Sequence, residues 1–199
     1  MNKAFLLIDN INNLTDLDID ISIERRNKAE RFSFVDDKKR CILAEVLLNK
    51  ALKCFDINKY ELVYNENNKP YIKDANIYFN ISHSGDYVVV IAADTEVGID
   101  IQKINGLKLN VAQKCFHENE YKNIINEKDI SKQTDLFYEY WTKKEAYTKA
   151  LGKGLAIPLN SFDVTSKDFD YHLEEIKVDK NYKCYVCSKE EISIQIKSN

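Results

Sequence analysis

The chain has 199 residues, which suffices for one substantial domain or two small half-domains, and its 44% hydrophobic and 31% charged residues are typical of a soluble globular protein. Its net charge of -3 argues against a general nucleic-acid-binding protein, which would normally be basic. The longest wholly apolar or aromatic run, Tyr87 to Ala93, is too short to cross a bilayer, so no membrane partner is expected.

The cysteines and the N-terminus favour a cytoplasmic protein. The five cysteines are an odd number, and Asp9 follows the first apolar residues too soon for a signal peptide, so reduced thiols are expected. Cys184 and Cys187 form one CxxC, but in a strand their side chains would point to opposite faces, which suits packing better than metal binding.

The N-terminal third predicts a strand followed by a helix. Lys3 to Ile8 has the character of a buried strand, and the residues after it are rich in Asn and Asp, as loops are. Ile23 to Phe34 carries mixed charges, and apolar residues then recur at helical spacing from about Asp36.

Four short strands are predicted next. The first, Tyr60 to Tyr64, leads into the strong turn signal Asn65 to Pro70. The others are Ile77 to Ser82, Tyr87 to Ala93 and Val97 to Gln102. Because the links between these three are short enough for hairpins, a β-meander is expected.

The remaining chain predicts helices and then strands. Helices are expected at Leu107 to Cys115, at Glu118 to Glu127 and from near Thr134. Alternating isoleucines from Ile192 to Ile196 predict a last strand, with Tyr182 to Cys187 as a plausible antiparallel partner. Since the order is not a regular βαβ alternation, the fold class is α+β, with an internal boundary near residues 103–107.

The long helix places a lysine inside its apolar stripe. At about 100° per residue, Lys144 lies among buried aromatic positions, and Glu145 with Lys149 forms an i,i+4 pair along one edge. A charge in a buried stripe is costly unless an anion meets it. Two interpretations stay open: an active-site helix for a metal–phosphate ligand, or an amphipathic helix whose lysines reach water.

A second acidic position lies on the strand Val97 to Gln102. The period of two puts Asp100 and Gln102 on one face, with Gly98 leaving space beside them. Such an oxygen pair suits Mg²⁺, and Glu145 would be the second carboxylate if the helix packs across this strand. The alternative is a strand-end acid bound to backbone amides.

His83 ends the apolar face of another strand, beside a glycine. A nucleophilic triad is not supported, because no GxSxG elbow is present and the adjacent Ser82 and His83 would point apart. His83 is either a phosphate donor or a satisfied structural histidine.

Taken in order, these motifs resemble the Sfp-type 4′-phosphopantetheinyl transferases, over about Glu24 to Val164. The matching segments are Asn68-Lys-Pro70, Phe79-Asn-Ile-Ser-His-Ser84, Val97-Gly-Ile-Asp-Ile101, Trp141-Thr-Lys-Lys-Glu-Ala-Tyr-Thr-Lys149 and Gly152-Lys-Gly-Leu155.

The resemblance implies two pseudo-symmetric halves, residues 1–103 and 104–199, each with a small antiparallel sheet packed by a long helix. They would form one compact monomer with the active site between the halves. It also implies Mg²⁺-dependent transfer of 4′-phosphopantetheine from coenzyme A to a serine of an acyl or peptidyl carrier protein, releasing adenosine 3′,5′-bisphosphate.

The resemblance also assigns roles to residues of this chain. Asp100, Glu145 and Gln102 would bind the metal, and Glu145, Lys149 and His83 would be catalytic. Coenzyme A would contact Lys144 and Lys149 at the diphosphate, Ser82 and His83 at a phosphate, Lys69 and Pro70 at the adenine, and Arg25, Lys28 and Arg40 at the 3′-phosphate. Glu120 resembles a recurring acid of the family, without a derived role.

Two departures from the family pattern matter. Gln102 replaces a third acid found in many relatives, and Asn68 replaces a glycine but tolerates left-handed turn geometry. Two rival functions stay open: a metal-dependent phosphodiesterase or nuclease, and a non-catalytic module that binds coenzyme A or a carrier.

Overall fold

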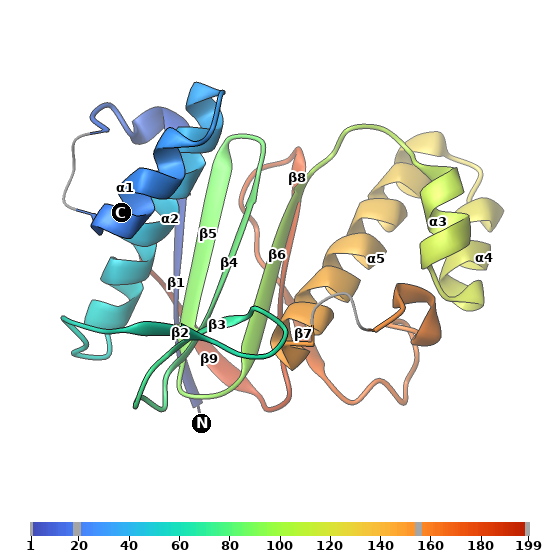
Figure 1. The fold of residues 1–199 in the computed structure, drawn as a ribbon. Coiled ribbons are helices and arrows are strands. Elements are labelled where there is room, and N and C mark those ends of the chain that lie inside the picture. The colour runs from blue at the N-terminus through green and yellow to red at the C-terminus, as the bar shows by residue number, and fades with distance from the viewer. Residues whose placement is uncertain (1, 18–20, 154–156, 198–199) are drawn as a thin grey trace.

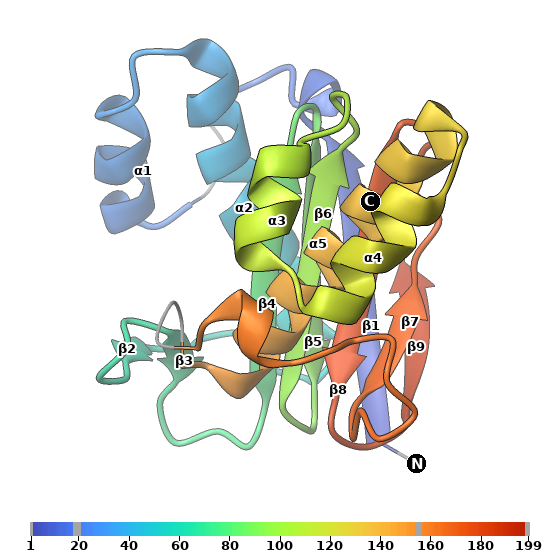
Figure 2. The ribbon, with the colours of Figure 1, turned by 90° about the vertical axis from the view of Figure 1, so that its right-hand side faces the viewer.

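The structure is a computed structural model that describes residues 2–17, 21–153 and 157–197. Figure 1 shows its layers in order: α2, a first sheet, a second sheet, α5, and finally α3 and α4. Figure 2 views the molecule from the side of these last three helices. The fold class is therefore α+β, as the order of elements predicts.

The first sheet has the strand order β4-β5-β1-β9. It consists of β1 (Asn2–Asn10), β4 (Tyr78–Ser84), β5 (Tyr87–Ala93) and β9 (Ile192–Lys197), and β9 lies parallel to β1 whereas the other pairs are antiparallel. Helix α2 (Val35–Lys53) covers one face, where Leu43, Leu47 and other buried side chains pack on the sheet.

The second sheet has the order β6-β8-β7 and is antiparallel throughout. Its strands are β6 (Val97–Lys103), β8 (Tyr182–Ser188) and β7 (His172–Glu175). Helix α5 (Ile130–Leu151) packs against β6 and β8. A Cβ atom on Gly98 would lie 2.1 Å from the carbonyl oxygen of Ala146 in α5, so this close approach requires glycine.

The inner faces of the two sheets form one apolar core. Along β5, Val88 and Val90 face α2, whereas Val89 and Ile91 pack with Ile99 of β6 and its neighbours. The alternation follows from the period of two, and because both faces of β5 are covered, nearly the whole strand is apolar and buried.

Two strand pairings differ from the sequence-based predictions. The hairpin of β4 and β5 is confirmed, but the third strand of the expected meander, β6, belongs to the second sheet. Both edges of β5 are already taken, by β4 and β1. Strand β9 likewise does not pair with β8, whose edges are taken by β6 and β7, and it adds to the free edge of β1.

These pairings cross the boundary predicted between residues 103 and 104. Strand β6 precedes the boundary but pairs with β8 after it, and β9 follows the boundary but pairs with β1 before it. The two sheets therefore do not coincide with the two predicted halves of the chain, and the pseudo-symmetry of those halves stays a prediction.

Shorter elements complete the fold. They are η1 (Ile11–Asn13), α1 (Ile23–Glu30), the hairpin β2 (Leu62–Tyr64) and β3 (Pro70–Ile72), α3 (Leu109–Cys115), α4 (Glu118–Asn126) and η3 (Leu159–Ser161). In the described ranges, none of the helices is both long and apolar enough to cross a membrane.

The long helix begins earlier than predicted and ends at Leu151. Asp129 caps its N-terminus by accepting a hydrogen bond from the Ser131 N–H, so the helix starts at Ile130 instead of near Thr134. Gly152 ends it with a left-handed φ of 65°.

Candidate active site

The carboxylate of Asp100 collects side chains from two strands and one helix. Asp100 is 2% exposed, and its Oδ1 accepts hydrogen bonds from Ser82 Oγ of β4 at 2.8 Å and from Lys149 Nζ of α5 at 2.6 Å. Its Oδ2 accepts from Gln102 Nε2 at 2.9 Å. Helix α5 thus packs across β6 as expected. The three donors to Asp100 are side chains, so the alternative of an acid bound to backbone amides is wrong.

Glu145 brings a second carboxylate into the electrostatic range of Asp100. Burial raises the pKa of Glu145, the negative charge of Asp100 raises it further, and Lys149 opposes the shift. Among the residues that the structure describes, the Glu145 carboxylate has no hydrogen-bond or ion-pair partner. Two acids that repel each other in a place poor in water are stabilised when a cation binds between them.

The donor set around Asp100 fits Mg²⁺. The described ranges bring together no group of three His, Cys, Asp or Glu residues, so the available ligands are two carboxylates and the Gln102 amide. Mg²⁺ is commonly held by one or two carboxylates, with substrate phosphates and water filling the other positions. The amide nitrogen of Gln102 faces Asp100, and a half-turn of the amide would present its oxygen instead.

Lys149 supplies the positive charge of this site, and we call Asp100, Glu145 and Lys149 the open cluster. Besides Asp100, its ammonium donates to Ser82 Oγ at 3.0 Å and to the Ile99 carbonyl at 3.2 Å. These three contacts use all three N–H groups of Lys149, as in Lys144, but the side chain of Lys149 is 28% exposed, so a ligand can approach its ammonium and replace one of the acceptors.

His83 and Arg40 lie on the α2 side of β4. Arg40 donates to the Gly85 carbonyl at 2.5 Å and to Asp37 Oδ1 at 2.7 Å. Burial lowers the pKa of His83, and the positive charges of Arg40 and Lys149 lower it further. The lowered pKa favours the uncharged ring, which can donate one hydrogen bond to an anion.

The other two basic residues of the predicted 3′-phosphate cluster are placed differently. Arg25 Nε donates to Glu45 Oε2 at 3.1 Å, and Glu45 also accepts from Ser22, the N-cap of α1. Arg25 therefore anchors α1 on α2, while Lys28 is exposed on α1. Their contact with coenzyme A stays a prediction.

The prediction that Lys144 meets the diphosphate is wrong in this structure. Lys144 is fully buried, and its ammonium donates to Glu120 Oε2 at 2.8 Å, the Leu159 carbonyl at 2.7 Å and the Phe162 carbonyl at 2.6 Å. These contacts use all three of its N–H groups. Burial lowers the pKa of Lys144, whereas Glu120 opposes the shift.

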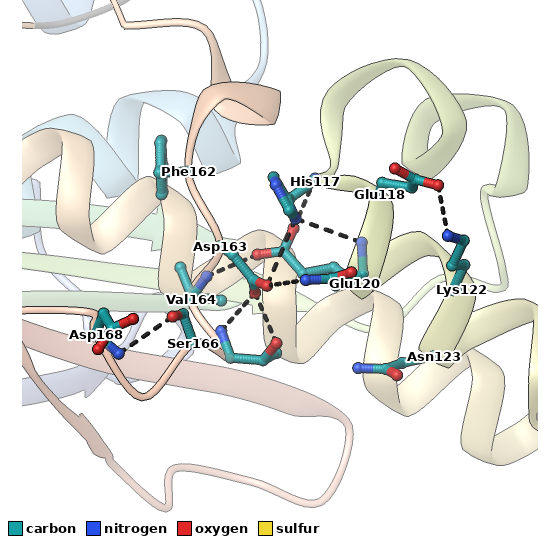
Figure 3. A network of polar contacts seen from close by, with 12 residues as sticks. His117, Glu118, Glu120, Lys122, Asn123, Phe162, Asp163, Val164, Ser166 and Asp168 are labelled. Atoms are coloured by element: carbon teal, nitrogen blue, oxygen red, sulfur yellow. Dashed lines mark hydrogen bonds and ion pairs between the residues drawn. The ribbon is translucent and has the colours of Figure 1, made fainter.

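Glu120 now has a structural role, which Figure 3 shows. Its carboxylate accepts from the backbone N–H of His117 at 2.9 Å and of Val164 at 2.8 Å, so it caps α4 and fixes the segment after η3. Nearby, Asp163 accepts from Asn119 Nδ2 at 2.9 Å. The capping-box spacing from His117 to Glu120 is a signal in the sequence that could have predicted this role.

Ser82 directs its hydroxyl to the carboxylate of Asp100. Its hydroxyl hydrogen goes to Asp100, and its oxygen accepts from Lys149 and from the backbone N–H of Ile101 at 3.3 Å. No O–H is left to donate to a phosphate, which corrects the predicted contact.

Lys69 binds the end of α5 with its ammonium group. Nζ donates to the carbonyls of Lys149 at 2.7 Å and Ala150 at 3.2 Å, and burial lowers the pKa of Lys69. Asn68 has a φ of 60°, which confirms its left-handed turn geometry. The adenine contacts of Lys69 and Pro70 stay a prediction.

One predicted motif lies partly outside the described residues. Of the segment Gly152 to Leu155, the structure describes residues 152 and 153, whereas Gly154 and Leu155 belong to the range 154–156, which it does not describe.

Comparisons with known proteins identify the family of the chain. The family model described as "4'-phosphopantetheinyl transferase superfamily" matches residues 96–193, and "4'-phosphopantetheinyl transferase, N-terminal" matches residues 15–96. The chain is similar to the 4'-phosphopantetheinyl transferase gsp of Aneurinibacillus migulanus, with 36% identity covering 86% of this chain and 78% of the relative. The 4'-phosphopantetheinyl transferases ffp of Bacillus subtilis and Sfp of Bacillus subtilis (strain 168) are each 34% identical, covering 84% of this chain and 82% of the relative.

Proposed function

The chain belongs to the 4′-phosphopantetheinyl transferase superfamily and is a 4′-phosphopantetheinyl transferase, and from this premise we propose its reaction in detail. It transfers the 4′-phosphopantetheine arm from coenzyme A to a serine hydroxyl of an acyl or peptidyl carrier protein. The reaction depends on Mg²⁺ and releases adenosine 3′,5′-bisphosphate. We further propose that the protein acts as a cytoplasmic monomer.

One observation carries this proposal: a second carboxylate, Glu145, lies beside Asp100 and near the partly exposed ammonium of Lys149, with no donor to it in the part of the chain that the structure describes. Asp100, Glu145 and the Gln102 amide would hold Mg²⁺. Bound there, the ion would neutralise the negative charge that grows on the diphosphate as the bond breaks.

The side chains of the protein then have separate tasks. Lys149 stabilises the diphosphate from the helix, and His83 with Arg40 orients a phosphate from the other face of β4. The serine oxygen forms a bond to the phosphorus nearer the pantetheine, and the bond from that phosphorus to the bridging oxygen breaks. Glu145 is the proposed acceptor of the serine proton.

The rest of the coenzyme would lie along the N-terminal part of the chain. We propose that Arg25 and Lys28 lie near the 3′-phosphate with Arg40, and that Lys69 and Pro70 line the adenine through the turn they form. Because the Lys69 ammonium already binds two carbonyls of α5, its contact with the base would come from the backbone or the methylene chain.

The test is to incubate the protein with coenzyme A, a Mg²⁺ titration and a panel of apo-carrier proteins, and to follow the carrier by mass spectrometry. We expect each served carrier to gain one 4′-phosphopantetheine group, and the gain to stop when the metal is chelated. Nucleic-acid cleavage without carrier loading would favour the phosphodiesterase alternative. Binding of coenzyme A without any loading would favour the non-catalytic module.

A further inference from the structure

Three polar side chains of β4 connect the two sheets, and we call Asn80, Ser82 and Ser84 the inter-sheet seam. Strands β4 and β6 run side by side but belong to different sheets (Figure 1). Each seam residue accepts a backbone N–H of β6. The bonds are Asn80 Oδ1 to Ile99 at 2.9 Å, Ser82 Oγ to Ile101 at 3.3 Å, and Ser84 Oγ to Lys103 at 2.9 Å.

The seam follows from strand geometry. Alternate residues of β4 point to one face, so positions 80, 82 and 84 all reach β6, with a constant offset of 19 residues. Their side-chain oxygens take the place of the carbonyl groups that a neighbouring strand would offer to the N–H groups of β6. The pattern Asn-x-Ser-x-Ser therefore joins the first sheet to the strand that carries Asp100.

The middle residue of the seam differs from the other two. Ser82 Oγ also donates to Asp100 Oδ1 at 2.8 Å and accepts from Lys149 Nζ at 3.0 Å, and Ser82 is 6% exposed. A hydroxyl has one hydrogen and two lone pairs, so this network uses all of them. Both Ser82 and Lys149 bind Oδ1, which leaves Oδ2 of Asp100 in contact with Gln102.

The opposite face of the same strand carries His83, in electrostatic range of Arg40 and Lys149. Strand β4 thus holds a phosphate-binding side chain on one face and the support of the metal-binding acid on the other. Whatever fixes β4 against β6 also fixes the spacing between these two groups.

We propose that Ser82 is a positioning residue that orients Asp100 and Lys149 relative to His83 before any ligand binds. The inference rests on the proposed function, because it assumes that Asp100 holds the metal and His83 a phosphate. Ser82 itself touches neither coenzyme A nor the carrier serine. It holds one carboxylate oxygen of Asp100 and one ammonium group of Lys149 in place, which lowers the cost of ordering them when Mg²⁺ and coenzyme A arrive.

Ser84 provides a matched control on the same strand. Its hydroxyl accepts a backbone N–H of β6 as Ser82 does, and no contact of Ser84 with Asp100 or Lys149 is present among the described residues. Replacing either serine by alanine removes one bond of the seam. Only the replacement of Ser82 also removes two bonds to the open cluster, one to Asp100 and one from Lys149.

The experiment compares Ser82→Ala with Ser84→Ala in the full chain. Both should lower the melting temperature in the absence of metal, and Ser82→Ala should lower it more because it removes three hydrogen bonds and Ser84→Ala removes one. Calorimetric titration of Mg²⁺ into the protein with coenzyme A, without carrier, should show about tenfold weaker metal binding for Ser82→Ala, because a hydrogen bond to a charged group is lost. Ser84→Ala should leave the metal affinity unchanged.

Turnover gives a second measurement. Ser82→Ala should lower kcat and raise the Mg²⁺ concentration needed for half-maximal rate, with little change in KM for coenzyme A. Equal effects of the two alanine variants on Mg²⁺ binding, or none for Ser82→Ala, would overturn the positioning role. If the wild-type protein itself loads no carrier, the proposed function is rejected instead.

Two further variants keep the test valid if Ser82→Ala does not fold. Ser82→Thr retains the hydroxyl and should keep wild-type Mg²⁺ affinity. Ser82→Cys retains the size but offers only a weak donor and acceptor, so it should show the weakened affinity. If the cysteine variant binds Mg²⁺ as well as the threonine variant, the hydroxyl does not position Asp100 and the proposal fails.

Discussion

Two lysines of α5 each pair with an acid from another element. One pair is fully buried and structural, whereas the other lies in the candidate active site and is partly exposed. The pair of Glu120 and Lys144, at 2.8 Å, is 0% exposed on both sides. The pair of Asp100 and Lys149, at 2.6 Å, has 3% and 28% of its side chains exposed. A short distance between opposite charges therefore does not by itself indicate a ligand site.

The difference lies in the balance of donors and acceptors. In both clusters the ammonium has three acceptors, but in the closed cluster, which we define as Glu120 and Lys144, the carboxylate also has Lys144 and two backbone N–H donors. The open cluster has two carboxylates and one ammonium, and the pKa of Glu145 is raised by burial and by the charge of Asp100. The unmatched negative charge indicates where a metal would bind.

The largest expected effect is on the open cluster. Glu145→Gln should keep the fold but lower carrier loading by about 10²–10⁴-fold, since it removes a side chain proposed both to bind the metal and to accept the serine proton. Circular dichroism checks the fold, and mass spectrometry of the carrier measures the rate. A variant that loads carrier at nearly the wild-type rate would show that Glu145 has neither role.

Breaking the closed cluster should affect stability instead. Lys144→Met leaves the Glu120 carboxylate buried without its cation and should lower the free energy of unfolding by about 3–5 kcal/mol. The double variant Glu120→Gln/Lys144→Met should recover part of this loss, as chemical denaturation would show.

The neighbouring Lys143 offers a matched control for this change. Its i,i+4 pair with Glu139 is only partly buried, so Lys143→Met should cost about 0.5 kcal/mol. If Lys143→Met and Lys144→Met destabilise the protein equally, the closed cluster has no special structural role.

Adding a negative charge to the open cluster should strengthen Mg²⁺ binding and destabilise the metal-free protein. Gln102→Glu brings a third carboxylate next to Asp100, so it should bind Mg²⁺ several-fold more tightly and lower the melting temperature of the metal-free protein. Melting curves with and without Mg²⁺ measure both effects. A stabilised metal-free variant would contradict the charge balance inferred here.

The raised pKa of Glu145 predicts a dependence of stability on pH. A carboxyl whose pKa is higher in the folded state than its usual 4.5 stabilises the fold at low pH, and this contribution is lost as the pH rises from about 4.5 through the raised pKa. In metal-free buffer, Glu145→Gln should therefore gain melting temperature relative to the wild type across that range. A difference in melting temperature that does not depend on pH would show that the pKa of Glu145 is not raised in the folded state.

The smallest effect is expected at the end of α5. Lys69→Met removes the ammonium that binds the carbonyls of Lys149 and Ala150 and should lower the free energy of unfolding by about 1 kcal/mol. Thermal denaturation measures this loss. Lys73→Met, which breaks an exposed pair with Glu61, is the control and should cost less.

The candidate site was only partly predictable from local patterns. The period of two put Asp100 and Gln102 on one face, and the helical period put Lys144 in the buried stripe, as the structure has them. The anion that meets Lys144 lies on α4, however, 24 positions earlier in the chain. No local period reports such a partner, and the resemblance to the family did not supply it either.

Ser82 illustrates the same limit. Its place on a strand was predicted, and so was its direction away from His83. Its partners come from β6 and α5, which meet β4 only after the two sheets pack together.

The sequence by itself determined which face of each element is buried and approximately where the helices lie, because side-chain periodicity acts between residues a few positions apart. Only the tertiary structure decided where β6 and β9 pair and which acid each lysine of α5 meets. A strand adds to whichever edge remains open, and a buried charge pairs with whatever opposite charge packing brings to it, so both depend on segments far apart in the chain.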